Sequence, residues 1–253
     1  MHIILGNVLD PVVAYVVAVV FIATVIRSSL GFGEALVAVP LLAMRIPIAI
    51  ATPLAVMLSV LVAAVVVAQD WRHVEVRSAS GLILSSLPGI PVGILLLSRG
   101  NEHVLKLLLG VLIAAFSIYC LAAGKQRHLP EDHRGLLVSC GFLAGVLGGA
   151  YGVNGPPLAI YGALRGWSPQ HFRATLQGYF LPASLMGLAG YAAAGLWNAA
   201  ITRYFLFSLP AVIVAILLGR AINRRLTGHG FFRLVYVGLI IIGIVLIIQA
   251  AGR

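Results

Sequence analysis

The sequence predicts an all-α integral membrane protein built from two homologous, inverted repeats, each with a broken or re-entrant helical hairpin and three transmembrane helices. Three observations predict this fold class. Of the 253 residues, 61% are hydrophobic and only 9% are charged, with a mean hydropathy of +1.06. Long apolar segments recur along the chain, and two glycine-rich stretches interrupt them at related positions. We therefore treat residues 1–253 as a single transmembrane domain.

Eight apolar segments approach the roughly 20 residues that a membrane-spanning helix needs. Two more, 34–44 and 156–165, are too short to cross alone. No basic region precedes Asp10 and no small-residue cleavage site follows it, so we expect the first segment to be retained rather than removed as a signal peptide. Pro88 marks a kink or a helix start in the third segment. The long segments are expected near 11–28, 48–68, 79–98, 103–123, 135–149, 172–194, 203–220 and 231–250.

Each short segment follows a break in the apolar sequence. The second break is the run GGAYGVNGPP at 148–157, and the first is the shorter SSLGFGE at 28–34. Irregular backbone inside hydrocarbon is tolerated only where protein or a water-filled cavity satisfies its polar groups. The pair of breaks therefore predicts a transport site.

The two breaks are related by an internal repeat. A shift of 121 positions (152 minus 31) aligns Gly31 with Gly152, and a shift of 122 positions (210 minus 88) aligns Pro88 with Pro210. We divide the chain into repeat 1 at 8–124, a polar linker at 125–133 and repeat 2 at 134–250.

The basic residues indicate how the repeats are oriented. If each break is the tip of a hairpin, about eleven lysines and arginines lie on one face and about five on the other, which fits the positive-inside rule. If the helices before the breaks cross fully instead, the division is about nine or ten against seven. We therefore expect inverted repeats with both termini outside the cytoplasm.

Polar residues near the breaks are candidates for anion binding and coupling. Proline suits the first turn of a helix, and the free amides and dipole of a helix N-terminus attract anions. Arg27 and Glu34 are ionisable at membrane depth, where function is the default interpretation. Arg27 would balance the anion and Glu34 would carry a coupling proton; alternatively, they pair with each other. The substrate-binding candidates are Arg27, Ser29, Gly31, Gly33, Tyr151, Gly152, Asn154, Gly155 and Gln177.

Other residue patterns argue against an enzyme or a metalloprotein. Cys120 and Cys140 have no CxxC spacing, so we expect no metal, disulfide framework or cofactor. The histidines are scattered, and no convergent nucleophile and base are found. The net charge of +10 (17 minus 7) is expected to set topology and contact lipid headgroups. The expected partners are a small anion and the lipid bilayer, with no nucleic acid; a homodimer stays open.

The sequence resembles the TauE/SafE sulfite exporter family, also called the toluene sulfonate uptake permease family. The resemblance rests on GGAYGVNGPPLAIYGALRGW (148–167), on GFGEALVAVPLLAM (31–44) and on the duplicated layout, and it covers essentially the whole chain. Glu34 stands where a glycine or another small residue is more usual in the family. The resemblance implies transport of sulfite, sulfoacetate or related sulfonates.

The energy source follows from a missing motif. No GxxxxGK[ST] phosphate loop is present in the sequence, so the energy would come from an ion gradient or from the substrate gradient. Our hypothesis is a secondary transporter in the cytoplasmic (inner) membrane that exports small sulfur-containing or organic anions by alternating access, coupled to protons. A passive anion channel and an uptake permease for sulfonates are the alternatives.

Overall fold

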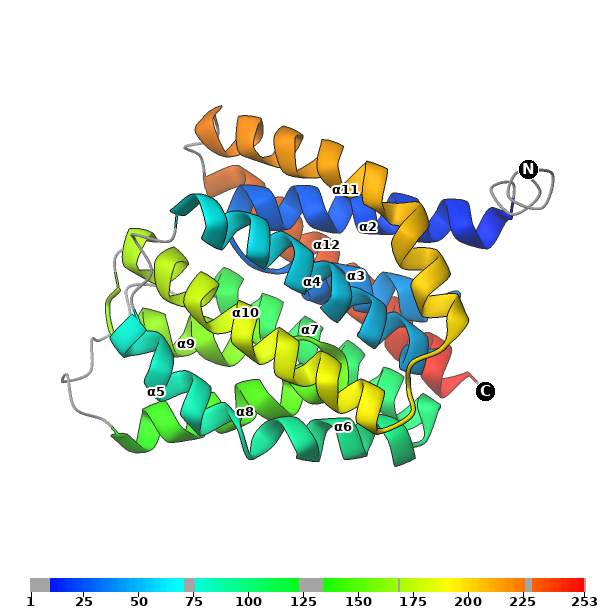
Figure 1. Ribbon diagram of the computed structural model, residues 1–253, viewed down its shortest axis with the longest axis horizontal. Coiled ribbons are helices and arrows are strands. Elements are labelled where there is room, and N and C mark those ends of the chain that lie inside the picture. The colour runs from blue at the N-terminus through cyan, green and yellow to red at the C-terminus, as the bar shows by residue number, and fades with distance from the viewer. Residues whose placement is uncertain (1–9, 71–75, 123–133, 168, 226–228, 253) are drawn as a thin grey trace.

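The chain forms a bundle of α-helices (Figure 1). The computed structural model describes residues 10–70, 76–122, 134–167, 169–225 and 229–252, and within these residues it has eleven helices and no strand. The linker predicted at 125–133 lies outside them. The helices are α2 (Pro11–Leu30), α3 (Glu34–Ala43), α4 (Ile48–Asp70), α5 (Val76–Ser86), α6 (Gly89–Arg99), α7 (Glu102–Ala122), α8 (Arg134–Tyr151), α9 (Gly155–Leu164), α10 (Pro169–Ala193), α11 (Ala199–Arg225) and α12 (His229–Ala251).

Several of these helices have the length and composition of membrane spans. Within the described residues, five are long and apolar enough to cross a bilayer, or six if the bent pair α5 and α6 forms one span. Large apolar side chains are exposed on the outer faces of α6, α7, α11 and α12. Contiguous exposed apolar surface of this kind is rare in soluble proteins and is stable against lipid. The chain is therefore a multi-pass membrane protein.

The prediction of one continuous segment at 79–98 needs correction. This region consists of α5 and α6, which are bent by 45° relative to each other. Pro88 directly precedes α6, and it has no backbone N–H to continue the hydrogen bonding of α5. The kink that Pro88 predicted therefore divides the segment into two helices.

The first break is a tight turn after which α3 folds back along α2. The Tyr15 hydroxyl, near the start of α2, donates a hydrogen bond of 2.7 Å to the Leu41 carbonyl, near the end of α3. Gly31 and Gly33 have φ angles of 86° and 94°. Glycine adopts such left-handed backbone without the steric cost that a side chain brings. The glycines thus permit the reversal.

The second break is a related turn between α8 and α9. Gly152 has a φ angle of 67° and donates its N–H to the Gly148 carbonyl over 2.8 Å. The Val153 N–H bonds to the Leu147 carbonyl over 3.2 Å. The bond from Gly152, which has left-handed backbone, is the 5→1 bond of the αL motif that commonly ends a helix. The chain then enters α9, which packs against α8.

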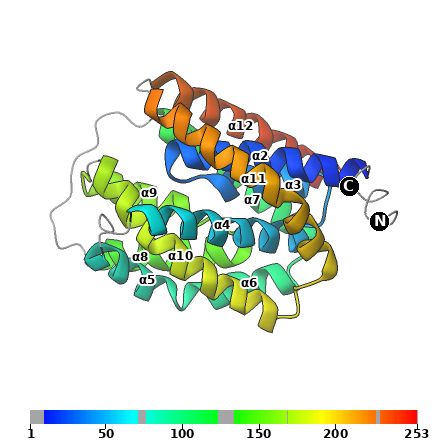
Figure 2. The ribbon, with the colours of Figure 1, turned by 45° about the horizontal axis from the view of Figure 1, so that its top comes forward.

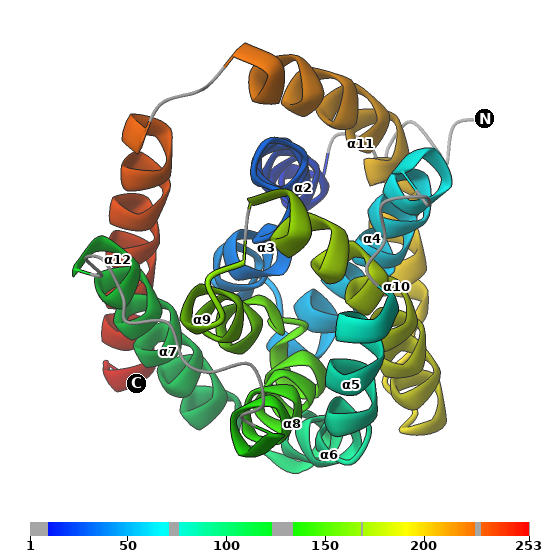
Figure 3. The same cartoon turned by 90° about the vertical axis from the view of Figure 1, so that its left-hand side faces the viewer.

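The helices pack in pairs that come from both halves of the chain. The main pairs are α2 with α11, α8 with α5 and α6, α7 with α12, and α4 with α10. Figure 2 shows α11 and α12 on one side of the molecule and α5 and α6 on the opposite side. In Figure 3 the short helices α3 and α9 lie inside the surrounding longer ones. In Figure 1, α2 begins and α12 ends at the same end of the bundle.

Glycines allow α6 and α8 to approach closely. A Cβ added at Gly89 or Gly93 of α6 would overlap the backbone of α8, and one at Gly145 or Gly149 of α8 would overlap the backbone of α5 or α6. Small residues four apart bring membrane helices into backbone contact in this way. Since α8 ends at the second break, this contact fixes the position of that break.

Candidate functional site

The two breaks meet at one small interior cavity. Its volume is about 20 Å³, which is little more than a single water molecule needs. The first residues of α3 and α9 both reach it, and side chains from α2, α4 and α10 complete its wall. The lining residues are Arg27, Phe32, Gly33, Glu34, Ala35, Leu36, Ser59, Gly152, Val153, Asn154, Gly155, Pro156 and Phe180.

The two breaks are in direct contact beside this cavity. A Cβ placed on Gly155 would lie 3.3 Å from a ring carbon of Phe32. A Cβ on Gly152 would lie 3.7 Å from the Cβ of Ala35, in the first turn of α3. Residues that are more than 110 positions apart in the sequence (152 minus 35 is 117) therefore share one site.

Arg27 is the positive charge of the site, and it is 4% exposed. Its Nη1 donates to Oε2 of Glu34 and to Oγ of Ser59, each over 2.6 Å. The centre of the guanidinium lies 5.4 Å from the centroid of the Phe180 ring, within cation–π range. Nη1 of Arg27 thus holds the guanidinium between α3 and α4. The plane of the guanidinium lies near α10.

The other two nitrogens of Arg27 have no partner among the described residues. Nε and Nη2 are both buried and make no hydrogen bond. A buried donor without a partner costs about 1–3 kcal/mol, and more when it is charged. These two N–H groups form one edge of the guanidinium, which matches two oxygens of a single oxyanion. The edge is therefore chemically suited to an oxyanion.

Glu34 is the negative charge of the site, and it is 2% exposed. Besides the ion pair with Arg27, its Oε1 accepts a hydrogen bond of 3.3 Å from the Thr24 hydroxyl. The Ser59 hydroxyl lies 3.5 Å from that of Ser184 on α10. The structure has the Arg27–Glu34 pairing that the sequence offered as the alternative to separate roles in transport.

Two helix N-termini contribute backbone amides to the site. The first amides of a helix have no partner within it and carry the positive end of the dipole. Neither Gly33, before α3, nor Asn154, before α9, caps its helix through a side chain. Pro156 and Pro157 have no N–H, so Gly155 is the residue that offers an amide at the very start of α9.

Six of the predicted site residues line the cavity, including the proton-coupling candidate. They come from both breaks, and two of them carry the opposite charges described above. The six residues are Arg27, Gly33, Glu34, Gly152, Asn154 and Gly155.

The four other candidates lie elsewhere or outside the described side chains. The Ser29 hydroxyl lies 2.8 Å from the Val25 carbonyl of its own helix and 3.2 Å from the Gly219 carbonyl of α11, and it shares its proton between them. Gly31 ends α2, with its N–H bonded to the Arg27 carbonyl over 2.6 Å. Tyr151 is buried but is not among the residues that line the cavity. Gln177 belongs to α10, and its side chain lies outside the described part.

Sequence reasoning missed several residues at this site, among them two phenylalanines and a threonine. Phe32 and Phe180 line the cavity, and Thr24 bonds to Glu34. The two phenylalanines gave no signal, because apolar residues fill most of this sequence. Thr24 precedes Arg27 by three positions, which places both on one face of α2, so helical spacing was a usable signal.

Comparison with known proteins supports the resemblance. A family model described as "Sulfite exporter TauE/SafE" matches residues 16–246. A protein of Cupriavidus necator named "Probable sulfite/organosulfonate exporter TauE" is 29% identical over 155 residues. The similar region covers 59% of this chain and 59% of that relative's length. No solved structure matches the chain.

Proposed function

The chain belongs to the TauE/SafE sulfite exporter family, and from this premise we propose that it moves small sulfur-containing or organic anions as a secondary transporter. Members of this family are membrane transporters and not enzymes. The proposed substrates are sulfite, sulfoacetate and related sulfonates, and the proposed location is the inner membrane. The relative from Cupriavidus necator, named a probable sulfite/organosulfonate exporter, supports this substrate class.

One observation carries the proposal: where α3 and α9 begin, a buried arginine has two nitrogens with no hydrogen-bond partner in the part of the chain that the structure describes. In our proposal, two oxygens of the anion bind Nε and Nη2 of Arg27. The amides at the starts of α3 and α9 and the Asn154 side chain bind the remaining oxygens. Sulfite and sulfonates carry three oxygens on one sulfur, so one anion can use both kinds of donor.

The proposed mechanism is alternating access around this site. A cavity of about 20 Å³ is too small for a four-atom anion, so the site must expand before substrate enters. We propose that the two hairpins and their partner helices belong to inverted repeats. The packing of α2 on α11 and of α8 on α5 and α6 supports this, because α11 is the counterpart of α5 and α6 in the sequence repeat.

We also propose that Glu34 carries a proton, which moves either in the same direction as the anion or in the opposite direction. Arg27 cannot bind both the Glu34 carboxylate and a substrate anion without leaving a net negative charge in a buried site. A proton on Glu34 removes that charge and weakens the interaction between Glu34 and Arg27. In this mechanism Thr24 and Ser59 keep the two side chains in place after the ion pair separates.

Flux in proteoliposomes tests the proposed function. Efflux of radiolabelled sulfite is expected to saturate with substrate concentration and to require the protein. Asn154→Leu removes a polar side chain from the cavity without a large change of volume. We expect it to raise the KM for sulfite about tenfold, the cost of one lost hydrogen bond of roughly 1.4 kcal/mol.

The matched control is Asn101→Leu, which changes an exposed asparagine beside the start of α7. Its KM is expected to equal that of the wild type. Fast, conductive and non-saturating flux would favour the alternative of a passive channel. An unchanged KM for sulfite in Asn154→Leu would show that the Asn154 side chain does not bind the substrate.

Glu34→Gln tests the coupling proton separately. Wild-type sulfite flux is expected to respond to a pH gradient imposed across the liposome membrane. The variant cannot ionise at this position, so its flux should follow the sulfite gradient alone. It should also bind sulfite more tightly, because no carboxylate competes for Arg27. A variant that keeps the wild-type response to the pH gradient would disprove the role of Glu34.

A further inference from the structure

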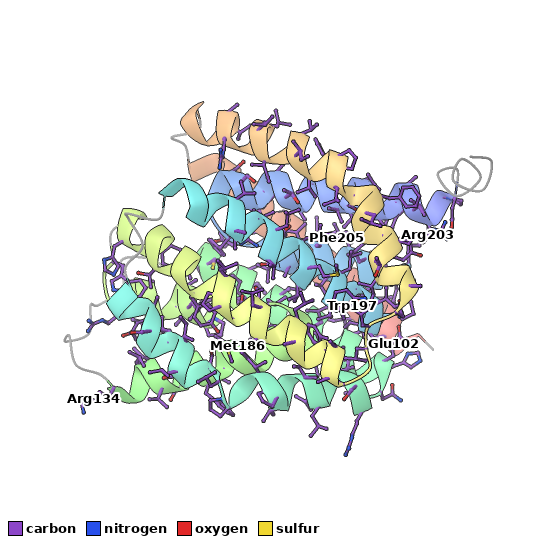
Figure 4. The ribbon with its side chains drawn as sticks, viewed as in Figure 1. Glu102, Arg134, Met186, Trp197, Arg203 and Phe205 are labelled. Atoms are coloured by element: carbon purple, nitrogen blue, oxygen red, sulfur yellow. The ribbon has the colours of Figure 1, made fainter. Side chains whose placement is uncertain are left out.

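A much larger cavity than the central one lies between α6 and α10. Its volume is about 630 Å³. On one wall α6 contributes Ile90, Ile94 and Leu95, and on the other α10 contributes Met186, Gly190 and Ala193. Figure 4 labels Met186 on α10. Because α10 offers mainly small residues along this stretch, the two helices leave an apolar groove between them.

The groove is open to the surroundings of the bundle. Leu95 is 49% exposed, and Ala193 is exposed at the end of α10. In a multi-pass membrane protein, such a surface faces hydrocarbon. An empty apolar groove forfeits the dispersion contacts of the atoms that line it, so hydrocarbon is expected to fill it.

The length of the groove corresponds to one leaflet of a bilayer. Helix α6 has 11 residues and therefore rises about 16 Å. Half of a hydrocarbon core is about 15 Å thick. The helix begins at the bend after Pro88 and ends at Arg99, which also lines the groove. The groove thus runs from the bend to a cation about one leaflet away.

The charge at this end favours an anion. Arg99 is exposed, and no ion pair within the described residues engages it. The acidic residue nearest in the sequence, Glu102, pairs with Lys106 over 2.8 Å. Ser98 lies beside Arg99 in the wall of the groove; its hydroxyl donates to the Leu95 carbonyl over 3.2 Å, and its oxygen adds polarity at this end. A guanidinium with a nearby hydroxyl is suited to a phosphate group.

We propose that this groove binds one anionic phospholipid, with an acyl chain between α6 and α10 and its phosphate on Arg99. The apolar walls hold the chain, and the arginine selects the charge of the headgroup. A second copy of this chain fits less well, because it would have to bring an acidic side chain to Arg99. Among the acidic residues whose side chains the structure describes, Glu34 is buried, and Asp10 and Glu102 are already paired with basic residues.

Native mass spectrometry tests this proposal. The purified protein is mixed with equal amounts of phosphatidylglycerol and phosphatidylcholine that carry identical acyl chains. We expect the wild type to retain one phosphatidylglycerol in preference to phosphatidylcholine. Arg99→Gln is expected to lower the ratio of retained phosphatidylglycerol to phosphatidylcholine about tenfold, the loss of a charge-assisted hydrogen bond. Ala193→Phe fills the groove and should reduce retention of both lipids.

The control is Arg203→Gln on α11, which does not line the groove and lies apart from Met186 in Figure 4. It should keep the wild-type lipid ratio. Arg99 and Ala193 are both exposed, so these variants are expected to keep the elution profile and thermal stability of the wild type. An unchanged ratio in Arg99→Gln, or full lipid retention in Ala193→Phe, would overturn the proposal. So would a lipid-free dimer that Ala193→Phe dissociates.

Discussion

Replacing Arg27 and Glu34 together with glutamine is expected to leave a folded protein that transports sulfite about 100-fold more slowly than the wild type at low substrate concentration. The double variant removes both buried charges, so neither is left unpaired. It also removes the charged N–H edge that we propose for the anion. Two charge-assisted hydrogen bonds of at least about 1.5 kcal/mol each account for the expected factor. Proteoliposome efflux of radiolabelled sulfite measures it.

The single variant Arg27→Gln should behave differently from the double. It leaves the Glu34 carboxylate buried without its cationic partner. Removal of one member of a buried ion pair costs about 3–5 kcal/mol of folding free energy. The single variant is therefore expected to be less stable than the double, which unfolding in mild detergent would measure.

A second ion pair in this chain supplies the matched control. Asp10 and Arg203 lie 3.6 Å apart, and each side chain is 37% exposed. Exposed pairs of this kind contribute little to stability. Asp10→Asn with Arg203→Gln removes the same two charges at the surface, and it should keep both transport and stability. If the double variant of the buried pair transports sulfite as fast as this control, the anion does not bind Arg27.

Gly93→Val is expected to lower the free energy of unfolding by about 3 kcal/mol or more, or to prevent folding. A Cβ at Gly93 would overlap the Val146 carbonyl and also meet the backbone of Ala150. Backbone cannot move aside as the end of a flexible side chain does. The valine would therefore separate α6 from α8 and displace the second break.

Gly238→Val on α12 is the control for the packing prediction. Nothing lies within 4 Å of a Cβ added at Gly238. Both variants replace a helical glycine with the same residue, so the difference in their thermal unfolding isolates the contact between α6 and α8. Equal unfolding temperatures would contradict the assigned role of the glycines.

The sequence predicted the helices well because their signals are local. Apolar length predicted eight long segments, and within the described residues five helices, or six with the bent pair, are long and apolar enough to cross a bilayer. Glycines identified both breaks, with two prolines in the second. Pro88 was identified as a kink or helix start, but the segment around it was still predicted as one span. Pro88 permits the division because it interrupts the hydrogen bonding of α5, but the sequence pattern does not contain the angle at which α5 and α6 pack against α8.

The site was predicted only in part, for a reason that particular residues illustrate. Charged residues in an apolar segment stand out, so Arg27 and Glu34 were found. Phe180 belongs to the site because α10 packs against α4, and nothing in its local sequence distinguishes it from other phenylalanines. Ser29 is as polar as the residues of the site, but it faces the Gly219 carbonyl of α11. Tertiary packing decides which polar residues share a cavity.

Equilibrium binding of sulfite shows whether the anion binds where the two breaks meet. Radiolabelled sulfite is titrated onto the purified wild-type protein and onto the variant in which Arg27 and Glu34 are both glutamine. We expect saturable binding to the wild type and a Kd about 100-fold higher in the folded variant. Equal affinity of the two proteins for sulfite would contradict this expectation.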